Sequence, residues 1–461
     1  YDYDRDSLEA GRLGTEPILP LLFRLAVPSI IGMASQALYN VVDSIYVGHI
    51  SKEALSALTL AFPIQMVLIA IAVGTGVGAT SLISRTLGAG DRERAGAVAE
   101  HALLAGLLFG AVVALAGALL SVSVTRLFTT DPHLVDMTSS YMRIIMIGSA
   151  ALFIPIILMG ILRGEGNTFV PMLAMGVGAA VNIGLDPLFI FGIWFFPRLG
   201  VEGAAYATVL SRFLSGLLIV GILLRGEGEV RISPRSFRFR FAVVRELYRV
   251  GLPAMSMQLL ASVMLAGGNL ILARHSTTAI AVFGIFFRLQ AFIFMPVFGL
   301  GQGVMPITGY NYGSGQPHRM KQGIRYGMLS AFLFTLAGFA VFQLIPRGLV
   351  TVFNRSPELV NIGVPALRRI SIGFLFVGPT IIGVNVFQAL GRGTPSFVIS
   401  ILRTVVLILP LMYLLGELFG LRVLWFAFPV SEFITFAVTL VWLTLVLKAL
   451  FLVLHREGGK T

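Results

Sequence analysis

The sequence predicts an all-α integral membrane protein with twelve transmembrane helices in two six-helix lobes. Three observations support this prediction. Of the 461 residues, 56% are hydrophobic and only 12% are charged, a composition that soluble globular domains do not have. The chain also contains a series of apolar stretches long enough to span a bilayer, which takes about twenty residues as a helix. Finally, motifs of the first half recur in the second half.

Twelve apolar stretches follow one another along the chain, and each predicts one span. The predicted spans cover residues 21–48, 54–84, 95–122, 139–162, 168–192, 202–224, 245–273, 278–308, 320–345, 360–390, 394–418 and 424–454.

The loops between the predicted spans alternate in their content of basic residues. Fifteen of the 34 lysines and arginines fall in segments 84–96, 162–167, 225–249, 312–322 and 455–460, and the opposite loops contain fewer. The positive-inside rule therefore predicts that these segments and both termini are cytoplasmic, in a protein of the cell inner membrane. We interpret the arginines of the central linker as positive-inside residues and not as a nucleic-acid surface, so no nucleic-acid partner is expected.

The two halves of the chain form an internal repeat. LFRLAVPSI recurs as LYRVGLPAM, which places Pro28 and Pro253 225 residues apart, and the turn glycines Gly90 and Gly315 have the same spacing. An even number of helices in each copy makes the repeat parallel, and such repeats usually enclose a central cleft near the membrane midplane. The predicted organisation is a cytoplasmic segment 1–20, an N-lobe 21–224, a basic cytoplasmic linker 225–244, a C-lobe 245–454 and a tail 455–461.

Asp186 is an acid inside an apolar run, VNIGLDPLFIFG. An intramembrane carboxylate is costly unless it is paired, hydrated or protonated, so it indicates a functional site. Asn182 lies one helical turn earlier on the same face, and Pro187 is expected to bend the helix and leave the Ile183 carbonyl free. The run resembles the discontinuous helices on which transporters hold coupling ions. The alternative is a structural aspartate bonded to a neighbouring helix.

A second acid, Asp43, belongs to a polar stripe on the first predicted helix. Gln36, Tyr39, Asn40 and Asp43 fall at helical spacing on one face of an otherwise apolar segment. Such a stripe predicts the lining of a substrate cavity. If the first and fifth helices are neighbours, Asp43 and Asp186 approach each other, and two poorly solvated carboxylates favour a shared proton.

Other polar residues allow two interpretations each. Tyr141 and Thr208 either complete the acidic cluster or make ordinary bonds between helices. Arg288 and Glu432 either pair with each other or line the cleft. The sequence contains no GxSxG, HExxH or Walker motif and no cysteine, so we expect neither an enzyme nor a bound cofactor.

At QALYNVVDSIYVG, NIGLDP and GAAYATVLS, together with RTLGAGD and RGEGNT, the sequence resembles the multidrug and toxic compound extrusion (MATE) transporters. It is most similar to the prokaryotic DinF-like or MepA-like members, over nearly the whole chain. The resemblance implies the fold shared by these transporters and the related flippases, with two lobes that open alternately to either side. It also implies export of cationic or amphipathic drugs in exchange for H+ or Na+, by a protein for which we expect a monomer.

The resemblance also implies roles for individual residues. The NorM-like branch has acidic cation ligands in its C-terminal lobe that this sequence lacks, which favours coupling through the N-lobe. Sodium coupling would make Asp43, Asn182 and Asp186 a metal site, with oxygen ligands that suit a hard cation. By motif, the coupling residues are Asp43, Asp186, Asn182, Tyr141 and Thr208, and Pro28 is the position at which the first helix is expected to bend.

The main alternative is a flippase for lipid-linked precursors, which shares the architecture. Such a protein is expected to have several cleft arginines for pyrophosphate, and Arg288 is the only clear mid-helix candidate by sequence. A membrane-embedded enzyme or a scaffold is a third interpretation, but the two acids have no histidine or metal-ligand companion.

Overall fold

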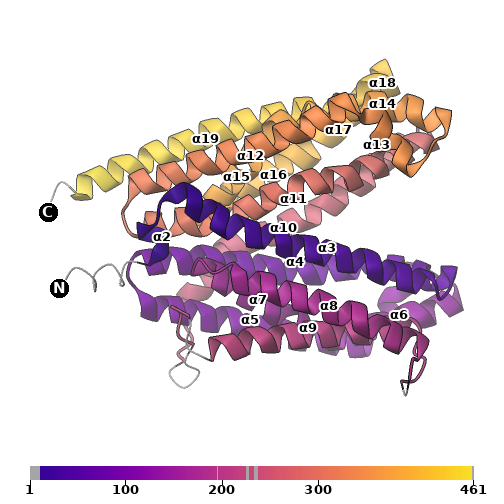
Figure 1. The fold of residues 1–461 in the computed structure, drawn as a ribbon, viewed down its shortest axis with the longest axis horizontal. Helices are drawn as coiled ribbons and strands as arrows, with labels where there is room; N and C mark the ends of the chain where they lie inside the picture. Colours follow the sequence, from indigo (N-terminus) through magenta and orange to yellow (C-terminus); the bar gives the residue numbers. More distant parts are fainter. Residues whose placement is uncertain (1–10, 195, 225–227, 233–236, 459–461) are drawn as a thin grey trace. The chain divides into compact units, whose positions relative to one another are not determined.

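The computed structural model describes residues 11–194, 196–224, 228–232 and 237–458, and almost all of them are helical (Figure 1). Ten helices are long and apolar enough to cross a membrane, and two bent helix pairs raise the total to as many as twelve spans among the described residues. The predicted all-α membrane fold is therefore confirmed. In chain order the helices are α2 (Arg12–Thr15), α3 (Ile18–Gly48), α4 (Lys52–Gly88), α5 (Arg92–Thr125), α6 (Pro132–Ile147), α7 (Ser149–Gly164), α8 (Phe169–Phe191), α9 (Val201–Leu223), α10 (Phe241–Ala273), α11 (Thr277–Gly313), α12 (Pro317–Leu344), α13 (Pro346–Phe353), α14 (Pro357–Ser371), α15 (Phe374–Ala389), α16 (Gly393–Ile401), the π-helical segment η2 (Leu402–Ile408), α17 (Leu409–Phe419), α18 (Leu421–Leu424) and α19 (Ala427–Gly458).

The internal repeat is visible in the helix boundaries. α4 and α11 both have 37 residues, and both their first and their last residues are 225 positions apart. Each of the two helices is followed by a turn in which a glycine, Gly90 or Gly315, adopts a positive φ, 77° and 66° respectively. Glycine is favoured there because other residues adopt this left-handed conformation at a cost.

Two predicted single spans are bent pairs. α6 and α7 meet at 48°, and α14 and α15 meet at 50°. The breaks follow Ile147 and Ser371, next to Gly148 and Gly373. The first of these spans also begins earlier than predicted: α6 starts at Pro132, where Asp131 caps the helix by accepting hydrogen bonds from the His133 and Leu134 amides.

The chain divides into two compact units, one of Ile31–Met255 and the other of residues up to Ile30 together with residues from Ser256 onward. The division falls inside α3 and α10, two residues after Pro28 and Pro253. It therefore differs from the lobe boundaries that we predicted at the linker.

The first unit, Ile31–Met255, contains most of α3, helices α4 to α9 and the start of α10. Small residues allow its helices to pack closely: a Cβ atom on Gly160 of α7 would lie 2.5 Å from the Gly76 carbonyl oxygen of α4. Beside this contact, the Thr80 hydroxyl donates a hydrogen bond of 2.7 Å to the Gly160 carbonyl. Small residues at such interfaces are typical of membrane helices.

The second unit has a core rich in phenylalanine. Phe286 of α11, Phe374 of α15 and Phe428 of α19 are buried against one another, with ring centroids 6.3 Å apart for Phe286–Phe374 and 5.7 Å for Phe286–Phe428. The start of α3 packs here too, since a Cβ atom on Gly299 would lie 3.2 Å from the Ile30 amide nitrogen.

Candidate functional site

α8 buries an amide and an acid on one face. Asn182 and Asp186 are 1% and 0% exposed, and α8 continues through Pro187 to Phe191. Both oxygens of the Asp186 carboxyl group and both polar atoms of the Asn182 amide have no hydrogen-bond partner among the described residues. Buried polar atoms are costly when unpaired, so this face is suited to hold a proton, a cation or water.

α3 places Asp43 next to Asp186. The two carboxyl groups are close enough to interact directly, and Asp43 Oδ1 is buried with no hydrogen-bond partner in the described part of the chain. Each acid lies five residues before the last residue of its helix, Gly48 or Phe191. Neighbouring carboxylates repel each other unless a proton or cation neutralises them.

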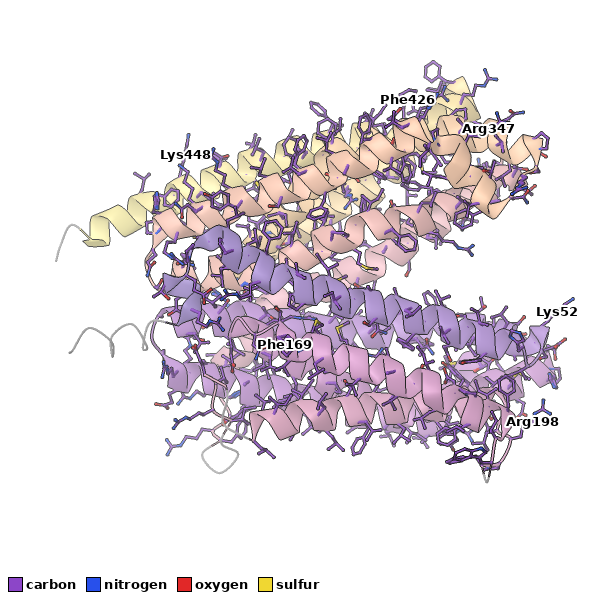
Figure 2. The ribbon with its side chains drawn as sticks, viewed as in Figure 1. Lys52, Phe169, Arg198, Arg347, Phe426 and Lys448 are labelled. Carbon is purple, nitrogen blue, oxygen red and sulfur yellow. The ribbon has the colours of Figure 1, made fainter. Side chains whose placement is uncertain are left out.

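The acids lie nearer to one end of the first unit. Lys52 and Arg198 mark that end, and Phe169, the first residue of α8, lies toward the other (Figure 2). Asp43 and Asp186 are both about 7.5 Å along the helix axis from the C-terminal ends of α3 and α8, so both are closer to the Lys52 end than to the other.

Tyr141 on α6 is buried beside the pair. Its hydroxyl accepts a hydrogen bond of 2.7 Å from Gln65 Nε2 of α4, and it interacts electrostatically with Asp43 and Asp186. Tyr141 is therefore hydrogen-bonded to α4 and lies within electrostatic range of both acids.

The remaining members of the predicted stripe have different surroundings. The Tyr39 hydroxyl accepts a hydrogen bond of 3.2 Å from Arg212 Nη2 of α9, and the Arg212 guanidinium carbon lies 5.3 Å from the Tyr39 ring centroid, which is a cation–π geometry. Gln36 is half-buried, and Asn40 is exposed. The stripe is thus polar along its length but is not uniformly buried.

Thr208 and Pro28 were the remaining residues singled out by the sequence. Thr208 is half-buried on α9, and its carbonyl accepts a hydrogen bond of 2.9 Å from Ser211 Oγ. Pro28 lies inside α3, which is continuous from Ile18 to Gly48.

The donor set of the cluster consists of oxygens and one amide. Among the described residues, no group of three or more His, Cys, Asp or Glu side chains is arranged to hold a metal ion. Two carboxylates with an amide and a phenol fit a proton, or a hard monovalent cation whose other ligands are carbonyls or water.

In the second unit, the buried acid is neutralised. Glu432 on α19 is buried, and its Oε1 atom accepts a hydrogen bond of 2.7 Å from Arg403 Nε and lies 2.6 Å from Arg403 Nη2. Arg403 belongs to the π-helical segment η2, and the Ser431 hydroxyl donates to its carbonyl at 3.1 Å. Of the two interpretations left open by the sequence, pairing with Arg288 is wrong, because Glu432 pairs with Arg403 instead and Arg288 is exposed.

Sequence reasoning missed Gln65, Arg212 and Arg403. All three are polar residues inside apolar candidate spans, and this signal was present in the sequence because such residues are rare in spans. The expectation that Arg288 is the only clear mid-helix arginine is therefore wrong.

Comparisons with known proteins agree with one another. The family model described as MatE matches residues 28–188 and 253–414. The chain is 28% identical over 417 residues to the multidrug export protein MepA of Staphylococcus haemolyticus, covering 88% of this chain and 89% of that protein. It is also 28% identical over 418 residues to an FAD transporter of Shewanella oneidensis, covering 90% and 92% respectively.

Solved structures give the same picture. A multidrug resistance MATE family transporter in an outward-facing conformation superposes with a TM-score of 0.89 at 29% identity, covering 96% of this chain and 98% of that one. A MOP superfamily transporter from Pyrococcus furiosus, described as having a binding pocket of reverse polarity, superposes with a TM-score of 0.88 at 30% identity, covering 95% and 98%.

Proposed function

This chain belongs to the MatE family of membrane transporters, and from that premise we propose that it is a multidrug efflux antiporter coupled through Asp43 and Asp186. The observation that carries the proposal is the pair itself, two interacting acids with buried oxygens that have no hydrogen-bond donor among the described residues. A secondary transporter needs such a site because its energy comes from an ion gradient.

The proposed cycle begins with an ion that reaches the acids from the external side. Binding lowers the negative charge of the Asp43–Asp186 pair by one unit, weakens the repulsion between the two carboxylates and favours an arrangement of α3 that releases the drug, with Pro28 as the position where α3 bends. Loss of the ion restores the negative charge and with it the affinity for cationic cargo. Each bound species shifts the conformational equilibrium only by its difference in affinity for the two states.

The coupling ion is H+ or Na+, and no other cofactor is proposed. A carboxyl pair is sufficient for a proton. For sodium, Asp43, Asn182 and Asp186 would supply oxygen ligands, and Tyr141 and Thr208 are the hydroxyls proposed to complete the site.

The proposed cargo is a small cationic or amphipathic compound, received near Gln36, Tyr39 and Asn40. The relative named a multidrug export protein supports a broad substrate range. A second candidate is an anionic aromatic compound such as FAD, which a relative of equal identity transports. The Arg212 guanidinium beside the Tyr39 ring favours this second candidate, because arginine binds phosphates and stacks on aromatic rings.

For its setting, we propose the cytoplasmic membrane, with both termini in the cytoplasm and a monomeric protein. The distribution of basic residues supports this orientation: the end of the first unit that includes Arg92, Arg94, Arg231, Arg238 and Arg240 would be cytoplasmic.

Transport by purified protein in proteoliposomes tests the proposal. Efflux of a cationic dye is measured with a pH gradient and a Na+ gradient imposed separately, for wild type, Asp43→Asn and Asp186→Asn. Asp136→Asn, which removes an exposed carboxyl group, is the matched control. We expect efflux driven by one of the two gradients, lost in both site variants and retained in the control. Absence of dye efflux under both gradients would contradict the proposal and favour the flippase, and uptake of FAD in place of the dye would favour the second cargo.

A further inference from the structure

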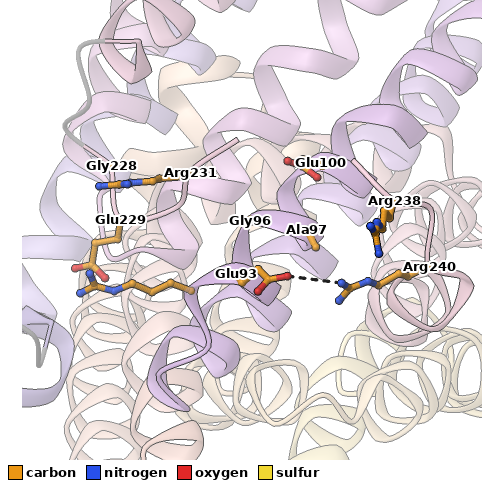
Figure 3. A pocket seen from close by; sticks show the side chains of 10 residues that line it. Glu93, Gly96, Ala97, Glu100, Gly228, Glu229, Arg231, Arg238 and Arg240 are labelled. Atoms are coloured by element: carbon orange, nitrogen blue, oxygen red, sulfur yellow. Dashed lines mark ion pairs between the residues drawn. The ribbon is translucent and has the colours of Figure 1, made fainter. Parts of the chain in front are cut away.

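A large polar pocket lies where the described part of the central linker packs against the first turns of α5. Its volume is about 830 Å³, within the range of small-molecule sites. The lining contains four arginines and three glutamates around small residues (Figure 3). The charged residues are Arg92, Glu93, Glu100, Glu229, Arg231, Arg238 and Arg240.

The linker wall of this pocket is fixed at two points. His101 on α5 is buried, and its two ring nitrogens lie 2.6 Å from the Ala97 carbonyl oxygen and 2.8 Å from the Arg240 amide, which donates to Nε2. The rings of Phe237 and Phe239 pack on His101, with centroid distances of 5.0 and 5.6 Å. These contacts hold Arg238 and Arg240 at the pocket rim.

The second point of attachment is Glu165, just after α7. Its Oε1 atom accepts a hydrogen bond of 2.9 Å from the Val230 amide. This bond fixes the backbone between Glu229 and Arg231, the two charged linker residues on the other side of the pocket. Hydrogen bonds therefore attach both linker segments of the pocket wall to the helices.

The charges of the pocket are mixed. Within the lining, Arg240 Nη2 lies 3.7 Å from Glu93 Oε1 in an ion pair, and both side chains are exposed. Four arginines favour a phosphate, because the guanidinium group matches phosphate oxygens. Three glutamates disfavour a purely anionic occupant but favour one that also carries an ammonium group.

The surroundings of the pocket are apolar. Phe239 and Phe241, which alternate with Arg238 and Arg240, are 61% and 70% exposed. The pocket lies where two membrane-spanning helices, α5 and α10, begin. Exposed aromatic rings beside arginines at the end of a span are typical of the membrane interface.

We propose that this pocket binds the headgroup of a phosphoethanolamine phospholipid. The phosphodiester lies among the arginines, the ammonium group faces the glutamates, and the acyl chains leave past Phe239 and Phe241. The inference requires the membrane-spanning assignment but neither of the coupling ions, so it stands or falls separately from the proposed transport.

Native mass spectrometry of the detergent-solubilised full chain tests the site. Phosphatidylethanolamine, phosphatidylcholine and phosphatidylglycerol with identical acyl chains are titrated, and the bound fraction is measured for wild type, Arg231→Gln with Arg238→Gln, and Glu229→Gln. The matched control is Arg245→Gln with Arg249→Gln, which removes two exposed arginines of α10 that do not line the pocket.

We expect wild type to retain phosphatidylethanolamine most strongly. The double pocket variant should bind it at least about tenfold more weakly, because each arginine near a membrane surface contributes a substantial attraction to phosphate. Glu229→Gln should reduce the preference over phosphatidylcholine, whose quaternary ammonium group cannot donate hydrogen bonds. Stronger retention of phosphatidylglycerol, equal retention of all three lipids, or equal loss in the control would overturn the proposal. Thermal melts of each variant establish that it is folded.

Discussion

The acids inside the helices of the two units have opposite charged neighbours. In the unit Ile31–Met255, Asp43 and Asp186 face each other, and their buried oxygens have no hydrogen-bond donor among the described residues. In the other unit, Glu432 is neutralised by Arg403 at 2.7 Å. A paired acid is locked into one charge state, whereas an acid whose only close charged neighbour is another acid gains from binding a cation. The comparison shows that a repeat can keep its architecture in both copies while the acids of the two copies differ in their charged partners.

The largest expected effect is the loss of coupled efflux when an acid of the first unit is replaced. Replacing Asp43 or Asp186 by asparagine removes a group that we propose to bind the ion, and coupled dye efflux should fall by at least about tenfold, within the range of ordinary coupling free energies. Replacing both Arg403 and Glu432 by leucine should leave efflux near the wild-type rate, because a buried ion pair can be exchanged for apolar residues of similar volume at little cost. Both sets are measured in the same proteoliposomes. Equal losses in the two units would show that the acid of the second unit also takes part in coupling.

The next effect concerns stability. Arg403→Leu alone leaves the Glu432 carboxylate buried without its partner, and we expect a loss of about 3 to 5 kcal/mol in the free energy of unfolding. The double leucine variant should recover most of that loss. Thermal unfolding of the purified variants measures both. If the single variant melts like wild type, Glu432 has another partner or is neutral, and the contrast between the units is weaker than described.

The sequence predicted the architecture well because the architecture depends on composition and length. Apolar length determines which segments span the membrane, and an identical spacing of 225 residues in turns and prolines identifies the repeat. The same criteria could not detect the 48° and 50° bends, since hydropathy records how apolar a segment is and not its direction. The glycines at 148 and 373, next to the breaks, were the available signal.

For the candidate site, the sequence identified the residues that are rare in membranes but not their partners. Asp43 and Asp186 stand out because acids in apolar helices are costly. Partners such as Arg403 for Glu432 or Gln65 for Tyr141 come from other helices, and helical spacing within one segment says nothing about which neighbour faces it. Their assignment required the packing of the helices.

A smaller effect tests whether Tyr141 belongs to the ion site or only connects helices. Tyr141→Phe removes the hydroxyl that accepts from Gln65 at 2.7 Å, which should cost about 1 kcal/mol of stability. Gln65→Leu with Tyr141→Phe removes both partners and should cost less than the sum of the single changes. Thermal melts give these values, and dye efflux is measured in parallel. If Tyr141→Phe changes the ion dependence of efflux while Gln65→Leu does not, the hydroxyl acts on the ion and not only on α4.

The last prediction concerns the pH dependence due to Glu165, an acid of the first unit that lies outside the spans and holds the linker. Burial raises the pKa of Glu165 to about 7, against the opposing effect of hydrogen bonds from the Val230 and Glu229 amides. An acid whose pKa is raised on folding binds its proton more tightly in the folded state. Its contribution to stability is therefore complete below the usual glutamate pKa of about 4.3 and is lost as the pH rises through about 7.

Glu165→Gln carries no titrating proton and should abolish this dependence. We expect the melting temperature of wild type to fall relative to that of the variant between pH 5 and pH 8, as about 4.3 to 7 is the window of the shift. Glu202→Gln, which removes a carboxyl group from the first turn of α9, is the control and should follow wild type. A constant difference between wild type and Glu165→Gln across this range would mean that Glu165 keeps its charge where it holds the linker, and that its bond to Val230 outweighs its burial.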